Sequence, residues 1–172
     1  SANSQAAWTF GGKDTDRVDV SVAPDWLDTG KAIDFDGDKE VDAYVVDFRK
    51  SSWQDIVVAQ AVDLVERGYS GVFLDDIGRY FDYGTDEASQ RDLAAEMVDL
   101  VIRIREAIGP DAKIITNGSV YLGTDAGGGS KLSDLLSAID MMVIESQFRT
   151  EGISEAIKNI EFAIEHYASG AQ

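Results

Sequence analysis

From residue 43 onward the sequence alternates short apolar runs with longer amphipathic segments, and this alternation limits the fold more than any other feature. The runs at 43–48, 71–74, 113–116 and 141–144 are rich in β-branched and other apolar residues, which predicts buried strands. The segments at 52–67, 86–108, 130–138 and 153–167 carry apolar residues at helical spacing, which predicts helices. Four consecutive strand–helix units predict right-handed crossovers and a parallel sheet.

The first 42 residues predict secondary structure less clearly than the rest of the chain. Residues 17–22 (RVDVSV) alternate and can form one more strand, whereas residues 1–42 otherwise predict an irregular segment. In the last predicted helix the isoleucines follow a 3–4 spacing. The residues of this helix that we expect to face the core are Ile153, Ala156, Ile157, Ile160 and Ile164.

The charge balance is strongly acidic, with 32 Asp and Glu against 15 Lys and Arg and a formal net charge of −17. This charge disfavours binding to nucleic acid or to an anionic membrane, and it favours a cationic ligand such as an amino sugar polymer. Surface acidity that serves solubility or a salty medium is the commoner explanation. There is no cysteine, so disulfide and thiolate chemistry are excluded, and the compartment, a secreted one included, stays open.

Two of the predicted strands end on carboxylates. Asp75 and Asp76 follow the run at 71–74, and Glu145 follows the run at 141–144. Parallel α/β folds gather their catalytic groups at the C-terminal ends of strands, and two carboxylates are sufficient for glycoside hydrolysis. We therefore expect Asp75 and Glu145 to be catalytic and Asp76 to contact substrate. The alternative for such an acid is that it caps the following loop.

The other two predicted strands also end on polar side chains. Asp47 ends the run at 43–48, and Asn117, followed by Gly118, ends the run at 113–116. Either residue can be structural, because Asp47 can pair with Arg49 and Asn-Gly is a common turn pair. In the functional interpretation, both side chains bind hydroxyl or amine groups of a sugar.

Aromatic and cationic residues follow the two strand-end acids. Tyr80 lies in the segment after Asp75, and Phe148 and Arg149 come shortly after Glu145. Aromatic rings at the rim of such a site can stack on sugar faces, although they can also simply pack the loops. We include Tyr80, Phe148 and Arg149 among the expected substrate-binding residues.

No metal or cofactor is expected. His166 is the single histidine and no cysteine accompanies it, which argues against a zinc site. The glycines at 127–129 lack the lysine and the spacing of a phosphate-binding loop. The acidic run at 34–40 departs from the calcium-loop template, because Lys39 and Val45 stand at its sixth and twelfth positions.

Several motifs together resemble those of one enzyme family. The letters VDFR at 46–49 with WQ at 53–54 are similar to a V-D-aromatic-R … W-Q segment, and GYSGVFLD at 68–75 is similar to a G-[FY]-x-G-V-x-L-D strand. The letters ITNG at 115–118 resemble an Asn-containing strand end, and residues 139–148 match I-D-x-x-x-x-E-x-x-F. The family that these motifs resemble is glycoside hydrolase family 114, the endo-α-1,4-polygalactosaminidase-like barrels.

The resemblance implies a TIM-barrel-type (β/α) fold that hydrolyses an α-linked, galactosamine-containing polysaccharide without a cofactor. It implies that Asp75 and Glu145 are the catalytic carboxylates and that Asp47 and Asn117 line the amino sugar subsite. It covers about residues 26–148. Members often carry a neutral residue and an acid where this chain has Asp76 and Arg79.

The length of 172 residues predicts a single domain, residues 1–172, with room for about five or six strands and thus an incomplete barrel. Unpaired sheet edges would then favour association of the chain with itself, or coverage of an edge by residues 8–22. A catalytically silent carbohydrate-binding or assembly module on the same fold is the alternative function. A flavodoxin-like domain is disfavoured, because no phosphate-binding loop follows any predicted strand.

Overall fold

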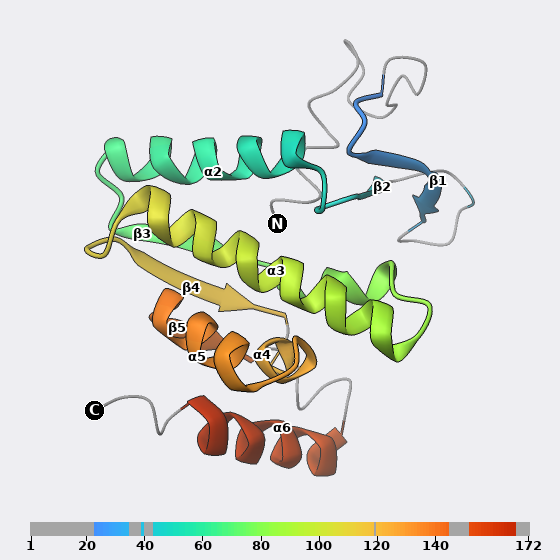
Figure 1. The fold of residues 1–172 in the computed structure, drawn as a ribbon, viewed down its shortest axis with the longest axis vertical. Coiled ribbons are helices and arrows are strands. Elements are labelled where there is room, and N and C mark those ends of the chain that lie inside the picture. The colour runs from blue at the N-terminus through green and yellow to red at the C-terminus, as the bar shows by residue number, and fades with distance from the viewer. Residues whose placement is uncertain (1–22, 35–38, 40–42, 119, 145–151, 168–172) are drawn as a thin grey trace. The chain divides into compact units, whose positions relative to one another are not determined.

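The computed structural model describes residues 23–34, 39, 43–118, 120–144 and 152–167 (Figure 1). The chain divides into two compact units, residues 1–60 and residues 61–172, and each unit is described by itself. The predictions made for residues 8–22 and for residues 145–151 lie outside the described residues.

The first unit contains a two-stranded antiparallel sheet. Strand β1 (Leu27–Ile33) pairs with strand β2 (Ala43–Val46), and the register shifts between Asp28 and Ala32. The prediction that residues 1–42 are irregular is therefore wrong for residues 27–33. The polar letters DTGK in the middle of β1 conceal its strand character, because the strand forms through backbone pairing with an apolar neighbour rather than through its own alternation.

The pairing of β2 also corrects a prediction. We expected the run at 43–48 to open the parallel sheet. In the part of the chain that the structure describes, β2 is hydrogen-bonded to β1, and the two strands are antiparallel. An apolar run indicates that a strand is buried, but it does not specify the neighbour with which the strand pairs.

Helix α2 (Ser51–Glu66) begins in the first unit and is held there by its first turn. The rings of Trp53 and Trp26 are both buried, with their centroids 4.7 Å apart. The hydroxyl of Ser52 donates a hydrogen bond of 2.7 Å to the carboxylate of Asp25. These contacts hold the beginning of α2 against the residues that precede β1.

The second unit is built on a parallel sheet with the strand order β3-β4-β5 (Figure 1). Its strands are β3 (Gly71–Leu74), β4 (Lys113–Asn117) and β5 (Met141–Val143). Leu74 lies opposite Thr116, and Asn117 lies opposite Val143. The prediction of an α/β fold with a parallel sheet is confirmed. The strands in the described ranges do not close into a barrel.

Helical segments connect these strands. They are the 3-10 helix η2 (Ile77–Asp82) and α3 (Glu87–Ile108) between β3 and β4, and α4 (Leu122–Asp125) and α5 (Gly129–Ala138) between β4 and β5. Helix α3 was predicted to within one residue from its helical spacing, and its N-terminus carries a reciprocal cap. The Ser89 amide donates to the Asp86 carboxylate, and the Asp86 amide donates to the Ser89 hydroxyl. Across the described residues, no helix has the length and apolarity needed to span a membrane.

The two faces of the parallel sheet have different surroundings. Side chains alternate along a strand, so Val72, Ile114 and Thr116 share one face, and all three are buried. Helix α3 packs an apolar stripe into the same core, namely Leu93, Ala94, Met97, Val98, Leu100, Val101 and Ile104. The opposite face carries Phe73 and Met141, which are 53% and 56% exposed. One face of the sheet therefore forms the core, while the other carries exposed side chains at Phe73 and Met141 and a buried one at Asn117.

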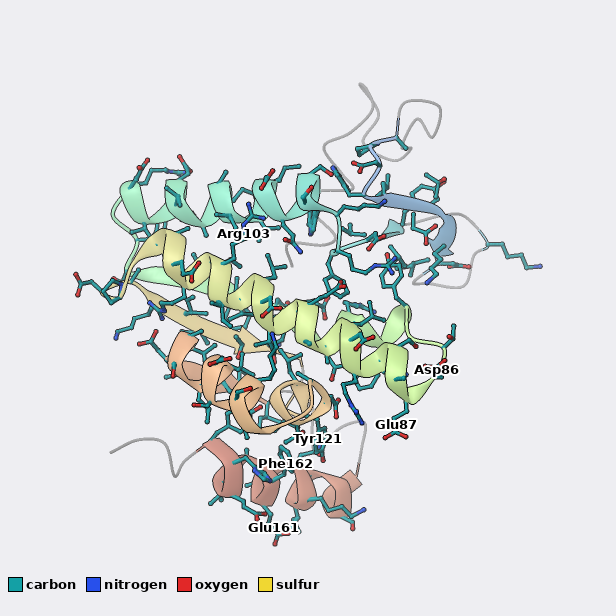
Figure 2. All side chains as sticks on the ribbon, in the orientation of Figure 1. Asp86, Glu87, Arg103, Tyr121, Glu161 and Phe162 are labelled. Atoms are coloured by element: carbon teal, nitrogen blue, oxygen red, sulfur yellow. The ribbon has the colours of Figure 1, made fainter. Side chains whose placement is uncertain are left out.

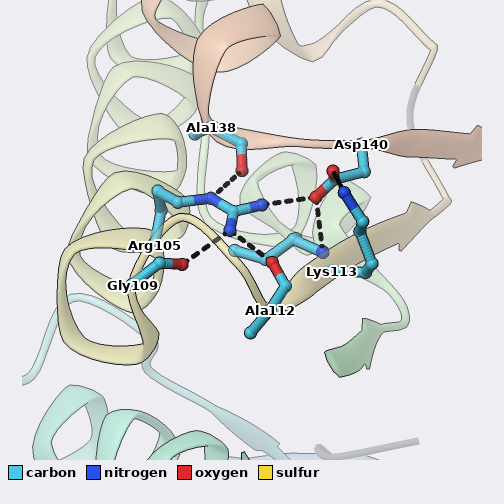
Figure 3. Close-up of polar contacts among 7 residues, drawn as sticks. Arg105, Gly109, Ala112, Lys113, Ala138 and Asp140 are labelled. Carbon is cyan, nitrogen blue, oxygen red and sulfur yellow. Dashed lines mark hydrogen bonds and ion pairs between the residues drawn. The ribbon is translucent and has the colours of Figure 1, made fainter. Parts of the chain in front are cut away.

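An ionic network joins the N-terminal ends of β4 and β5 (Figure 3). Asp140 accepts hydrogen bonds from Arg105, from Lys113 at 2.8 Å and from the Ile114 amide at 2.9 Å. The Arg105 guanidinium also donates to the backbone carbonyls of Gly109, Ala112 and Ala138. Burial raises the pKa of Asp140, but the hydrogen bonds from Lys113, Ile114 and Arg105 outweigh burial and lower the pKa to about 2.

Helix α6 (Gly152–Tyr167) buries only part of the side that we predicted, and among the expected core residues the burial of Ala156 is confirmed. Ala156 and Asn159 are buried, and the Phe162 ring packs on Tyr121 with the centroids 4.5 Å apart (Figure 2). The hydroxyl of Tyr121 donates a hydrogen bond to Asn159. The isoleucines that we expected to be buried are exposed, namely Ile157 (47%), Ile160 (37%) and Ile164 (61%).

The physical reason lies in the width of the apolar arc of α6. Ala156, Phe162 and the isoleucines together cover much of the helix circumference. An aromatic contact and a buried amide hydrogen bond decide which part of this arc is docked. Spacing alone favours the isoleucine stripe, so this part of the prediction is wrong.

Candidate functional site

The candidate site lies at the C-terminal ends of two neighbouring parallel strands. Asp75 directly follows β3, and Asn117 is the last residue of β4. Because Leu74 is paired with Thr116, the next residue along each strand brings Asp75 beside Asn117. The Asn117 side-chain amide donates a hydrogen bond of 3.0 Å to Asp75 Oδ1. The structure thus brings together two of the predicted site residues.

The two oxygens of the Asp75 carboxylate have different surroundings. Oδ1 accepts hydrogen bonds from the Asn117 amide and, at 2.9 Å, from the Asp76 backbone N–H. Oδ2 has no hydrogen-bond partner among the described residues. One oxygen is therefore held by two donors, which orients the carboxylate, while the other remains available to a bound molecule.

Asn117 has an unpaired acceptor that solvent does not reach. Its side chain is 2% exposed, and its Oδ1 atom has no hydrogen-bond partner within the described part of the chain. Buried polar atoms are nearly always paired, because an unpaired one carries the full cost of desolvation. Of the two unpaired oxygens at this edge of the sheet, only Oδ2 of Asp75 is therefore a candidate for contact with a bound molecule.

The backbone beside this pair is tightly constrained. Asp76 adopts the left-handed conformation, with φ at 59°, at the start of η2. Gly118, with φ at 108°, lies so close that a Cβ atom there would be 3.2 Å from the Asp76 Cα. Left-handed non-glycine residues are uncommon and cost free energy unless their surroundings fix them. The Gly118 turn therefore determines the course of the chain after Asp75.

Asp76 itself points to a different partner. Its carboxylate lies 3.6 Å from the Arg79 guanidinium, in a partly exposed ion pair. The structure thus separates the roles of the two adjacent acids, because Asp75 bonds to Asn117 across the sheet and Asp76 pairs along η2. The substrate contact predicted for Asp76 stays a prediction.

Tyr80 does not lie where a stacking residue must lie. Its side chain is fully buried, its hydroxyl donates a hydrogen bond of 2.5 Å to Asp125, and its ring packs on Phe81. A sugar cannot stack on a ring that no solvent reaches, so the predicted stacking role of Tyr80 is wrong. The sequence placed Tyr80 correctly after Asp75, but it could not show that the 3-10 helix turns the ring inward.

Asp47, in the first unit, forms the salt bridge that sequence analysis named as its structural alternative. Arg49 binds it through two donors, with Nε–Oδ1 and Nη2–Oδ2 distances of 2.6 and 2.8 Å. Burial raises the pKa of Asp47, but the hydrogen bonds and charge of Arg49, together with Lys50, bring the pKa below its usual value. A bidentate pair of this kind orients the carboxylate firmly.

The remaining predicted site residues, Glu145, Phe148 and Arg149, lie outside the described residues. Within the described ranges, no group of three or more acidic or histidine side chains could hold a metal ion.

Comparison with known proteins adds no family assignment. No protein-family model matches the chain, and no curated protein matches it. The resemblance of its strand-end motifs to glycoside hydrolase family 114 therefore stays a prediction.

Proposed function

We propose that this chain is a glycoside hydrolase of the TIM-barrel type that acts on an α-linked, galactosamine-containing polysaccharide. The observation that supports this proposal is the Asp75–Asn117 hydrogen bond at the C-terminal ends of adjacent parallel strands. That edge is where (β/α) folds place their chemistry. The available Oδ2 of Asp75 is the atom that would meet the substrate.

In the proposed mechanism Asp75 and Glu145 act as the pair of carboxylates. One protonates the leaving oxygen, and the other acts as nucleophile or activates water. A separation of about 5 Å between the carboxyl groups would favour retention of configuration, and roughly 6.5–9.5 Å would favour inversion. Asn117 is a positioning residue, because it holds one Asp75 oxygen and leaves the other to react.

The substrate class follows from charge and from the available acceptor. A net charge of −17 favours a cationic polymer over an anionic one. The unpaired Oδ2 of Asp75 can accept a hydrogen bond from an ammonium or hydroxyl group of an amino sugar. No cofactor, nucleic acid or membrane takes part in this proposal.

A second candidate function is a carbohydrate-binding or assembly module without catalysis. The observation that favours it is the open parallel sheet, whose described strands do not close into a barrel. Fewer loops then surround the strand ends, which leaves the site less enclosed and more exposed to water. Open edges of this sheet would also favour association of the chain with itself.

Hydrolysis of partly deacetylated galactosaminoglycan, measured as the release of reducing ends, distinguishes the two functions. The hydrolase proposal expects turnover by the wild-type chain and loss of turnover in both Asp75→Asn and Glu145→Gln. A matched control is Asp63→Asn, because Asp63 is an exposed acid on α2 that pairs only weakly with Arg67. Retention of the polymer without hydrolysis would support the binding module, and neither retention nor hydrolysis would contradict both functions.

A further inference from the structure

A chemically reactive pair of residues stands at the end of β4. Of the asparagines in the sequence, only Asn117 precedes a glycine, Gly118. An asparagine in this context loses its side-chain amide most readily, because glycine has no Cβ atom to shield its backbone nitrogen. Asn159, by contrast, precedes the β-branched Ile160, whose side chain shields that nitrogen. The sequence therefore concentrates the tendency to deamidate beside Asp75.

The fold requires both residues of this pair. The Asn117 amide donates the 3.0 Å hydrogen bond that joins β4 to Asp75. Gly118 has a φ of 108°, and a Cβ atom there would lie 3.2 Å from the Cα atom of Asp76. A substitution that removed the reactive sequence would therefore remove either the contact between strands or the turn. The lifetime of the site thus depends on how the folded chain restrains the reaction.

The reaction begins with attack of the Gly118 backbone nitrogen on Cγ of Asn117. The carbonyl electron pair moves to Oδ1 and returns, and Nδ2 leaves as ammonia with the proton that the Gly118 nitrogen gives up. The new C–N bond closes a succinimide ring. Water then opens the ring at one of its carbonyls, which gives aspartate or, with the backbone routed through the side chain, isoaspartate.

The folded site opposes the first of these steps. Attack places negative charge on Oδ1 of Asn117, a buried atom that has no hydrogen-bond donor among the described residues. An oxyanion that forms away from water and without donors is strongly disfavoured. The adjacent Asp75 carboxylate repels the same charge, and its Oδ1 holds the amide nitrogen that must leave. Burial and Asp75 therefore both raise the barrier to ring closure.

We propose that Asn117–Gly118 is a latent modification site, which stays amidated while Asn117 bonds to Asp75 and deamidates when this end of the sheet opens. Asp75 thereby protects its neighbour, apart from any catalysis. Deamidation replaces an amide that donates to Asp75 with a second carboxylate that repels it, so the modified strand end closes poorly. The inference is independent of the proposed function, because it concerns the chemical lifetime of the chain and involves no substrate.

Incubation at mildly alkaline pH, followed by peptide mapping with mass spectrometry, tests the site. In guanidinium chloride we expect Asn117 to lose its amide, while Asn159, followed by Ile160, stays intact as an internal control. Without denaturant, conversion of Asn117 should be at least roughly 100-fold slower, because only a locally opened state can react. Equal rates in the two conditions would overturn protection by the fold. An unmodified Asn117 in denaturant would overturn the site itself.

The protective role of Asp75 is tested in the folded chain. Asp75→Asn removes the repelling charge and the charged acceptor, so conversion of Asn117 should become about tenfold faster. The matched control is Asp76→Asn, because Asp76 pairs with Arg79 and should leave the rate unchanged. Asp140→Asn weakens the opposite ends of β4 and β5 and controls for a general loss of stability. An unchanged rate in Asp75→Asn, or equal acceleration in either control, would overturn the assignment to Asp75.

Thermal melting of Asn117→Asp tests the consequence of the modification. This substitution imitates the aspartate product, and we expect it to lower the melting temperature at pH 7, because two carboxylates then face each other across the strands. A melting temperature equal to that of the wild-type chain would overturn the claim that the modified end closes poorly.

Discussion

Asn117 and Asp75 join the ends of two neighbouring parallel strands through one hydrogen bond of 3.0 Å. The bond uses one N–H of the Asn117 side-chain amide, whose buried carbonyl oxygen has no hydrogen-bond partner among the described residues. It also uses the Asp75 oxygen that already accepts the Asp76 amide, so the second oxygen stays open. The orientation of both acceptors thus depends on a single contact between strands.

Removal of this contact tests the positioning role of Asn117. We expect Asn117→Ala to lower kcat roughly 10- to 100-fold, because a small displacement of the reacting carboxylate has an effect of that size. Its stability should change by less than about 1 kcal/mol, since a lost hydrogen bond is offset by removal of an unpaired buried oxygen. Kinetics and urea unfolding measure the two quantities.

Asn159→Ala is the matched control for that variant, because Asn159 is another buried asparagine that accepts a hydrogen bond, from Tyr121. Its loss is expected to lower stability and leave kcat unchanged. Equal effects of the two substitutions on kcat would contradict a specific role for Asn117.

The Gly118 turn should be sensitive to a single methyl group. In Gly118→Ala the new Cβ would combine a disfavoured φ of 108° with close contacts at 3.2 and 3.4 Å to the Asp76 backbone. We expect stability to fall by roughly 1–3 kcal/mol, and activity to fall as the chain after Asp75 shifts. Gly68→Ala separates strain from contact, because Gly68 also has a positive φ but its Cβ would meet nothing within 4 Å. Identical losses in the two variants would contradict a steric role for Gly118.

The Asp140 network predicts a contribution to stability that depends on pH. The pKa of Asp140 is lowered from 3.8 to about 2, so the folded state holds this proton less tightly than the unfolded state does. Solvent screens this exposed group, so its contribution to stability is no more than about 1 kcal/mol. The contribution is present above pH 4 and is lost as the pH falls towards 2. Urea unfolding of Asp140→Asn should therefore show a deficit at pH 7 that shrinks near pH 2.5. A deficit independent of pH would mean that packing, rather than charge, explains the effect.

Helix α6 offers a test of which of its sides is docked. Ile164 is 61% exposed, so Ile164→Ser is expected to change stability by no more than about 0.5 kcal/mol. Ala156 is completely buried, so Ala156→Leu should overpack the contact and cost about 1–3 kcal/mol. Thermal or urea unfolding of the two variants measures these changes in stability and shows which side of α6 is docked. A large loss from Ile164→Ser would restore the arrangement that the isoleucine spacing predicted.

Some features of the candidate site could be predicted from sequence patterns, and others could not. The strand ending at Asp75 and the strand ending at Asn117 were predictable, because an apolar run followed by a polar residue is a local signal. Parallel pairing then follows from the helix between them, and it makes the two residues neighbours. The burial of Tyr80 was not predictable, because it depends on a 3-10 helix that turns the ring towards Asp125.

The sequence by itself determined the α/β class, the three parallel strands, the bounds of α3 and the residues that stand at the strand ends. These properties are local, since each depends on periodicity, capping or a short apolar run. The tertiary structure alone decided that β2 pairs with β1, that α6 exposes Ile157, Ile160 and Ile164, and that Asp75 offers one oxygen and not both. Each of these outcomes depends on contacts between residues that are far apart in the sequence. The free energies of such contacts arise only when the chain is folded.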